Sequence, residues 1–101
     1  MSLNIKVSQF VNKNQFTIRV GNKLYFQSYE SLIAEIDPKR KRKVKLFSNW
    51  DYSNTTRKHL YIFLGWYGGY TISTRLDNAK NKRQEVLKMI KEGLIIYDKS
   101  R

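Results

Sequence analysis

The fold of this chain is decided by residues 49–65, which read NWDYSNTTRKHLYIFLG. Asp51 or Ser53 suits a helix N-cap, because a short side-chain oxygen accepts a backbone N–H left free in the first helical turn. Gly65 suits the left-handed position that stops a helix. Four residues recur at helical spacing and predict a stripe that packs on the protein interior: Thr56, Leu60, Phe63 and Leu64. Ile62 is predicted to point away from this stripe.

The residues before this helix predict β-structure. Residues 3–11 alternate between apolar and polar side chains, which is typical of a half-buried strand. The polar run 12–15 predicts a turn. Residues 16–20 and 23–28 predict two further strands, joined by Gly21-Asn22 as a two-residue hairpin turn, because glycine accepts positive φ at the first turn position.

Residues 28–37 fit either a strand or a helix. A strand is favoured, because Val44, Leu46 and Trp50 offer it an alternating partner across the loop 37–42. A proline in that loop prevents both helix continuation and ladder donation.

The residues after the first helix predict a second helix and a last strand. Residues 65–70 form a predicted aromatic connector, and Thr74 suits the cap of the second helix. The predicted buried face of that helix comprises Ala79, Arg83, Val86, Leu87 and Ile90. Gly93 is predicted to end it, and residues 94–97 to return to the sheet. We therefore expect one α+β domain over residues 1–101: an antiparallel sheet of five to six strands with two helices packed on one face.

Composition restricts the class of protein. The 101 residues include no cysteine, which excludes disulfides and thiolate metal sites. The longest apolar run is too short to span a membrane, and the first residues lack the build of a signal peptide, so we expect an intracellular protein with no membrane partner. Lys and Arg number 20 against 8 Asp and Glu, a net charge of +12. Such a field attracts polyanions, most commonly nucleic acid; an acidic protein surface is the alternative.

The densest cluster of charge is the run 38–45, PKRKRKVK. Adjacent cations repel one another, so the cluster favours binding of an anion. On a hairpin loop it would contact phosphates without reading base sequence. The residues predicted to bind nucleic acid are Lys39, Arg40, Lys41, Arg42, Lys43 and Lys45 of this loop, together with Arg57, Lys58, Lys82 and Arg83. The alternatives are a solvated, mobile loop and a chance likeness to a nuclear import signal.

Aromatic side chains form a second candidate surface. Trp66, Tyr67 and Tyr70 lie among glycines, where they are predicted to be exposed and to stack on bases or to contact a partner. Core packing is the alternative, and it is the role expected of Trp50 and Phe63.

The sequence offers no arrangement typical of catalysis. His59 is the single histidine, and no Cys, His or carboxylate stands at ligand spacing from it. The acids show no paired-carboxylate pattern, and there is no P-loop or dinucleotide fingerprint. We therefore expect no catalytic residues, no cofactor and no metal.

Two segments resemble a known group of proteins. Residues 26–34 read FQSYESLIA, and residues 50–59 read WDYSNTTRKH. They resemble motifs of a family of short, functionally uncharacterised proteins carried by phages and mobile elements of Gram-positive bacteria, over roughly residues 16–64. This resemblance implies a phage-type accessory protein in the cytoplasm of a bacterial host cell. It implies no active site.

The sequence thus predicts a non-enzymatic protein that binds DNA or RNA mainly through phosphates. The alternative function is a phage-encoded inhibitor of a host defence or transcription complex, of the anti-CRISPR or anti-restriction type. Such an inhibitor would act by protein–protein contact, with a host nucleoprotein complex as its partner.

Overall fold

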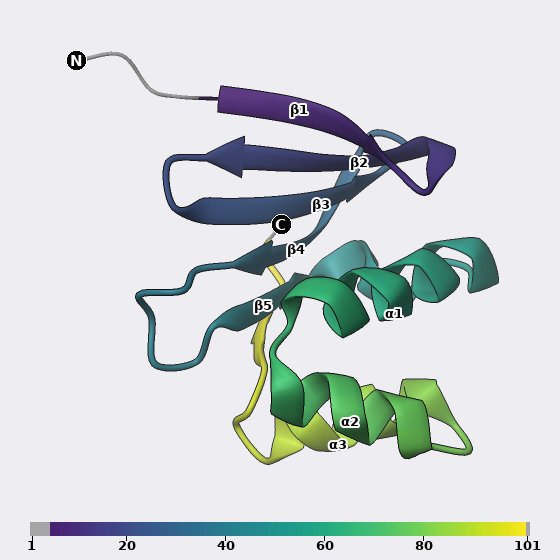
Figure 1. The fold of residues 1–101 in the computed structure, drawn as a ribbon. Coiled ribbons are helices and arrows are strands. Elements are labelled where there is room, and N and C mark those ends of the chain that lie inside the picture. Colours follow the sequence, from purple (N-terminus) through teal and green to yellow (C-terminus); the bar gives the residue numbers. More distant parts are fainter. Residues whose placement is uncertain (1–4, 101) are drawn as a thin grey trace.

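The computed structural model describes residues 5–100 and arranges them as a six-stranded sheet with helices (Figure 1). The strands are β1 (Ile5–Phe10), β2 (Asn12–Val20), β3 (Lys23–Ser28), β4 (Ser31–Ile36), β5 (Val44–Phe47) and β6 (Ile96–Asp98). The helices are the short 3-10 helix η1 (Ser48–Asp51) and the α-helices α1 (Asn54–Tyr67), α2 (Tyr70–Asn78) and α3 (Lys82–Lys91). The predicted α+β class is confirmed.

The strands lie side by side in the order in which they occur along the chain. The first four pairings are antiparallel and the last, between β5 and β6, is parallel. The predicted Gly21-Asn22 hairpin is confirmed: Val20 pairs with Lys23, and Gly21 has a φ of 60°. The strand prediction for residues 28–37 is also confirmed, because β4 pairs with β3 on one side and with β5 on the other.

The turn between β1 and β2 does not lie in residues 12–15, as predicted. It lies at Val11, which has a φ of 62°, and Phe10 pairs with Asn12 across it. The polar residues that follow form the start of the long strand β2. Gln15, for example, is buried opposite Ser28 of β3. Pairing with strands on both sides therefore overrides the polar, turn-like composition of this segment.

Helix α1 begins as predicted at Ser53, whose side chain accepts a hydrogen bond from the Thr56 backbone N–H at 3.1 Å. The whole predicted stripe is buried, which confirms the orientation of the helix: Thr56, Leu60, Phe63 and Leu64. Ile62 was predicted to point away, but it is partly buried against the same core.

The predicted end of this helix at Gly65 is wrong. Helix α1 continues to Tyr67, and only Gly68 and Gly69 separate it from α2. The two additional residues are held by tertiary packing, because the rings of Phe10 and Trp66 make a T-shaped contact at a centroid distance of 5.1 Å. Most of the predicted flexible connector is therefore helical.

Residues 5–100 form three α-helices, where two were predicted. The expected second helix is split, because Asn81 starts α3 by accepting a hydrogen bond from the Gln84 N–H at 3.1 Å. Thr74 lies inside α2 and is not a cap. Of the predicted buried face, Val86 is buried, but Leu87 is exposed and Met89 takes its place in the core. The predicted end of the helix near Gly93 is confirmed by the positive φ of that residue, 83°.

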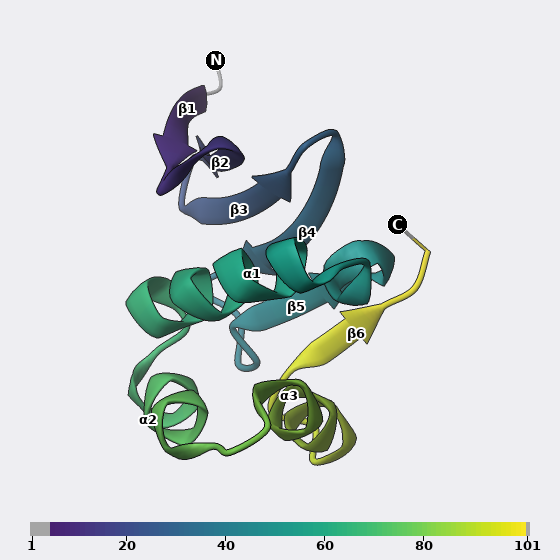
Figure 2. The ribbon, with the colours of Figure 1, turned by 90° about the vertical axis from the view of Figure 1, so that its right-hand side faces the viewer.

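The helices cover only part of the sheet. Helix α1 packs on β3 and β4, and α2 contacts α1 and α3. Both views place the β1–β2 hairpin at the end of the molecule remote from α2 and α3 (Figures 1 and 2). Strand β1 is consequently not half-buried as predicted: Ile5 and Val7 are 58% and 59% exposed. The start of that predicted strand, Leu3, lies outside the described residues.

Candidate nucleic-acid interface

The loop between β4 and β5 carries five of the ten residues predicted to bind nucleic acid, and Figure 1 shows it projecting from the sheet. Arg40 is folded back onto the protein, with its Nη1 2.6 Å from Glu35 Oε1. Its guanidinium also donates to the carbonyl oxygens of Arg42 and Lys43, at 2.7 and 3.2 Å. Asp37 accepts a hydrogen bond from the backbone N–H of Lys39 at 3.1 Å. These contacts give the loop a defined conformation.

Glu35 anchors this arrangement from strand β4. Burial alone would raise the pKa of this carboxyl, but hydrogen bonds from Arg40 and Tyr25 outweigh it, and the pKa lies below its ordinary value. The charges of Arg40 and Lys45 act in the same direction, and Lys45 stands opposite Glu35 in the β4–β5 ladder. Arg40 and Lys45 therefore serve the protein's own carboxylate.

Of the four other cations in this loop, three lie together at a cleft and remain available to a ligand. In the described part of the chain, the exposed side chains of Lys41, Arg42 and Lys43 form no ion pair. They line a cleft of about 370 Å³. Residues 68–72 line the same cleft, together with Val44, Gly93 and Leu94. The structure thus brings the predicted basic cluster beside Tyr70, one of the predicted aromatic residues.

Residues 68–72 include the N-terminus of α2, which adds a second source of positive potential. The N-cap residue Gly69 supplies no side-chain cap to the backbone N–H groups that follow it. The first N–H groups of a helix have no intrahelical partner, and the helix dipole is positive at this end. The cleft is therefore lined both by cationic side chains and by residues of a helix N-terminus, where the potential is positive.

Sequence reasoning missed this helix terminus, because it placed the start of the second helix at Thr74. The pair Gly68-Gly69 was the available signal. Gly69 has φ 98° and ψ 164°, a conformation open essentially to glycine alone, and it permits the sharp change of direction between α1 and α2.

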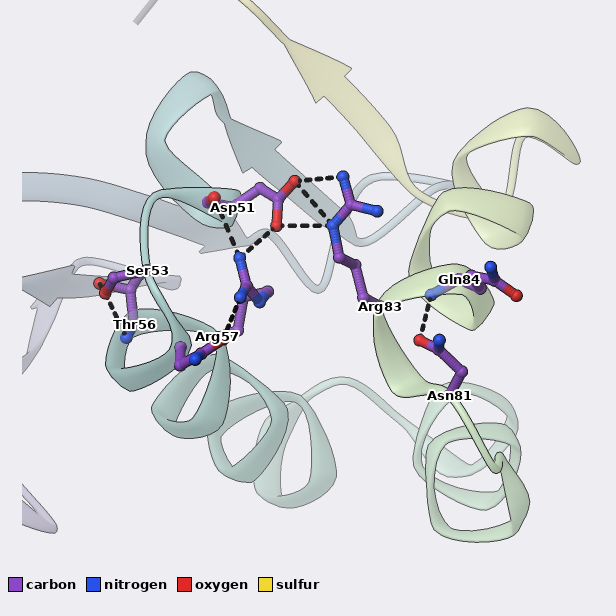
Figure 3. A network of polar contacts seen from close by, with 8 residues as sticks. Asp51, Ser53, Thr56, Arg57, Asn81, Arg83 and Gln84 are labelled. Atoms are coloured by element: carbon purple, nitrogen blue, oxygen red, sulfur yellow. Dashed lines mark hydrogen bonds and ion pairs between the residues drawn. The ribbon is translucent and has the colours of Figure 1, made fainter.

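The remaining predicted cations lie along α1 and α3, and two of them share one carboxylate (Figure 3). Asp51 accepts from Arg57 Nη1 at 2.7 Å and is 2.7 Å from Arg83 Nη2. The hydrogen bond from Arg83 is the main cause that holds the pKa of Asp51 below its ordinary value. The two arginines thus tie the entry of α1 to α3, and both guanidinium groups are engaged by the same carboxylate.

A groove of about 660 Å³ brings Arg57, Lys58, Lys82 and Trp66 together. Lys82 Nζ donates to the carbonyl oxygen of Leu76 at 2.7 Å, and Asp77 also lines the groove. With Arg57 paired, Lys58 is the member of this set best placed to contact a phosphate.

A further cleft, of about 600 Å³, has a different chemical character. Its wall contains no Lys or Arg; it is formed by Ser28, Tyr29, Glu30, Ser31, Ile33, Asn49, Tyr52, Ser53, Thr55 and Thr56. Tyr29 and Tyr52 are exposed at this cleft. Hydroxyl groups with exposed tyrosines supply adaptable hydrogen bonding and rigid contact area, which suits a protein surface better than a phosphate.

His59 has a structural position. Its ring is buried, and Nδ1 lies 2.9 Å from the carbonyl oxygen of Thr55, so Nδ1 carries the proton and donates. His59 is absent from the walls of the three clefts described above. Within residues 5–100, no three His, Cys, Asp or Glu side chains gather into a group that could hold a metal ion. Nor does any helix in this range have the length and apolarity to cross a membrane.

Comparison with known proteins gives one match. A family model described as "Family of unknown function (DUF8033)" matches residues 3–85. Neither the curated proteins nor the solved structures include a match to this chain.

Proposed function

Since the chain belongs to the DUF8033 family, whose function is unknown, its role has to be inferred from its own surface, and we propose that it is a non-enzymatic nucleic-acid-binding protein. One observation carries this proposal: Lys41, Arg42 and Lys43 are free of ion pairs among the described residues and line one cleft with the first residues of α2. This is the chemistry of a phosphate-binding surface.

The different roles of the loop cations support the proposal. The neighbouring cations Lys41, Arg42 and Lys43 repel one another, yet Arg40 holds the loop in a conformation that keeps them together, through hydrogen bonds to the carbonyl oxygens of Arg42 and Lys43. A bound phosphate relieves that repulsion and releases counterions from the nucleic acid. Lys39 and Lys58, which are also exposed, extend the footprint. Because these contacts go to phosphates, binding is independent of base sequence.

The decisive experiment is a salt titration of oligonucleotide binding, read by fluorescence anisotropy. Each phosphate contact contributes about 0.7 to 0.9 to the slope of log affinity against log salt. The variant Lys41→Gln/Arg42→Gln/Lys43→Gln should bind more weakly, with a slope shallower by about 2 to 3. The matched control Lys23→Gln/Lys80→Gln/Lys91→Gln removes the same charge from exposed sites elsewhere and should retain most of the affinity. An unchanged slope in the loop variant would exclude the loop as the binding surface.

The resemblance to phage and mobile-element proteins supports a place for this activity in the cytoplasm of a bacterial host. The same resemblance supports the second candidate function, inhibition of a host defence or transcription complex by protein contact. The cleft between Tyr29 and Tyr52 favours this alternative, because it is rich in hydroxyl groups and its wall carries no cation.

Salt dependence separates the two functions, because a packed protein interface loses far less affinity with salt than phosphate contacts do. The alternative predicts a complex that survives nuclease treatment. It also predicts that Tyr29→Ala/Tyr52→Ala abolishes this complex, whereas the triple loop variant leaves it intact. Loss of the complex on nuclease treatment would favour nucleic acid as the ligand.

A further inference from the structure

A separate cleft of about 280 Å³ lies between the β1–β2 hairpin and the end of α1. Lys6 of β1 stands directly opposite Arg19 of β2, and Ser8 stands opposite Thr17 in the next pair on the same face. All four line the cleft. Two cations placed opposite each other in a sheet destabilise it. No Asp or Glu is present in the cleft wall to offset this repulsion, and neither cation forms an ion pair among the described residues.

The other wall of the cleft is aromatic and comes from the last turn of α1. Trp66 and Tyr67 both line it. Phe10 holds the two rings, with centroid distances of 5.1 Å to Trp66 and 6.4 Å to Tyr67. Trp66 is nevertheless 63% exposed, in contrast to Trp50, which is 3% exposed. Because the Trp66 ring is held by Phe10 and is largely exposed to solvent, a nucleic-acid base can stack on it.

We propose that this cleft binds one nucleotide of a single-stranded nucleic acid. The phosphate lies between Lys6 and Arg19, the hydroxyl groups of Ser8 and Thr17 hydrogen-bond to the sugar–phosphate backbone, and the base stacks on Trp66. A base offers its face to a side chain only when it is unpaired, so stacking on Trp66 requires a single strand. This inference rests on the proposed function and restricts its ligand to single strands.

The position of the cleft connects it with the basic loop. Tyr67 lines this cleft, and the next residue, Gly68, lines the cleft of Lys41, Arg42 and Lys43. In this proposal, a strand seated on Trp66 continues past the end of α1 to the N-terminus of α2 and the loop cations. Cations and aromatic rings in alternation along a path are the usual design of a single-strand channel.

Tryptophan fluorescence tests the proposal directly, because the chain has two tryptophans and one of them is buried. The probes are an oligodeoxyuridylate and an oligouridylate of about 12 nucleotides, which carry the same base and differ only in the sugar; this length falls within the site sizes of single-strand binders. Both should quench the emission of the wild-type protein, and the tighter of the two identifies the preferred sugar. Trp66→Phe, which keeps a ring against Phe10, should abolish the quenching and leave the emission of Trp50 unchanged.

Affinity measurements supply the second readout. Lys6→Gln/Arg19→Gln should weaken single-strand binding about tenfold to a hundredfold, with little effect on a duplex of equal length. The control Lys23→Gln removes a cation from the opposite face of the same sheet and should bind like the wild type. Absence of quenching by either strand, or an equal loss of duplex and single-strand affinity, would overturn the proposal. The triple loop variant distinguishes failure of the single-strand site from failure of the proposed function. If this variant loses binding while Trp66→Phe and Lys6→Gln/Arg19→Gln retain it, the loop binds phosphates but the Trp66 cleft does not bind a single strand.

Discussion

Arg40 and Glu35 form an ion pair of 2.6 Å that divides the basic loop into one structural cation and a group of free ones. Glu35 is buried, and Arg40 is its principal partner. Because Arg40 also donates to the carbonyl oxygens of Arg42 and Lys43, the same side chain sets the backbone path of the residues that remain available. Arg40 therefore has a structural role, whereas the other cations of the loop remain available to a ligand.

Single substitutions of Arg40 and Arg42 should distinguish stabilisation of the fold from ligand binding. Arg40→Gln leaves the Glu35 carboxylate buried without its cation, and we expect the free energy of unfolding to fall by about 1 to 3 kcal/mol. Arg42→Gln removes the same charge from an exposed site, so the free energy of unfolding should change by less than about 0.5 kcal/mol while oligonucleotide affinity falls. Urea denaturation and anisotropy measure the two effects. Equal destabilisation by the two variants would contradict the structural role of Arg40.

Lowering the pH should weaken the ion pair between Arg40 and Glu35. The pKa of Glu35 is lowered in the folded protein from an ordinary value of 4.5. A carboxyl with a lowered pKa stabilises the fold fully above its unfolded value, and the stabilisation disappears as the pH falls through the folded pKa. The difference in unfolding free energy between the wild type and Glu35→Gln should therefore be constant near neutral pH. It should shrink below about pH 4.5, as urea denaturation across a pH series would show. A difference that grows with acid would mean that the sign of the pKa shift is wrong.

Local sequence signals predicted those parts of the fold that neighbouring residues determine. Gly21-Asn22 encodes its turn through backbone conformation alone, and the stripe from Thr56 to Leu64 encodes the orientation of α1 through periodicity. Neither signal depends on a distant segment. For this reason the α+β class, the β2–β3 hairpin and the buried face of α1 were all predicted correctly.

The cleft at Trp66 could not be predicted, because it depends on the register of two strands. Lys6 faces Arg19 only because the chain turns at Val11, a β-branched residue with positive φ that no turn propensity would select. A turn within residues 12–15 would have produced a different set of cross-strand neighbours. The continuation of α1 to Tyr67 likewise depends on Phe10, more than fifty residues earlier in the chain.

The orientation of α1 can be tested through its core. Leu60 is fully buried within the cluster that joins the sheet and the helices. Leu60→Ala should lower the free energy of unfolding by about 2 to 5 kcal/mol, because it removes buried methyl groups and leaves a cavity. Lys58→Ala, on the exposed side of the same helix, should change it by less than about 0.5 kcal/mol. Similar melting curves for the two variants would show that the helix is oriented differently.

The two glycines on either side of the end of α1 give a test in which the sign of the effect is decisive. Gly65 lies inside the helix, and a Cβ added there would meet no atom within 4 Å. Gly65→Ala should therefore stabilise the protein by about 0.5 to 1 kcal/mol, through the better helix propensity of alanine. Gly69→Ala should destabilise it by about 1 to 3 kcal/mol, because φ is 98° at that position. If Gly65 were instead the left-handed stop that the sequence suggested, alanine would destabilise there too. Thermal melts of the two single variants would decide between the two helix ends, and a gain at position 65 with a loss at position 69 is the outcome that the fold requires.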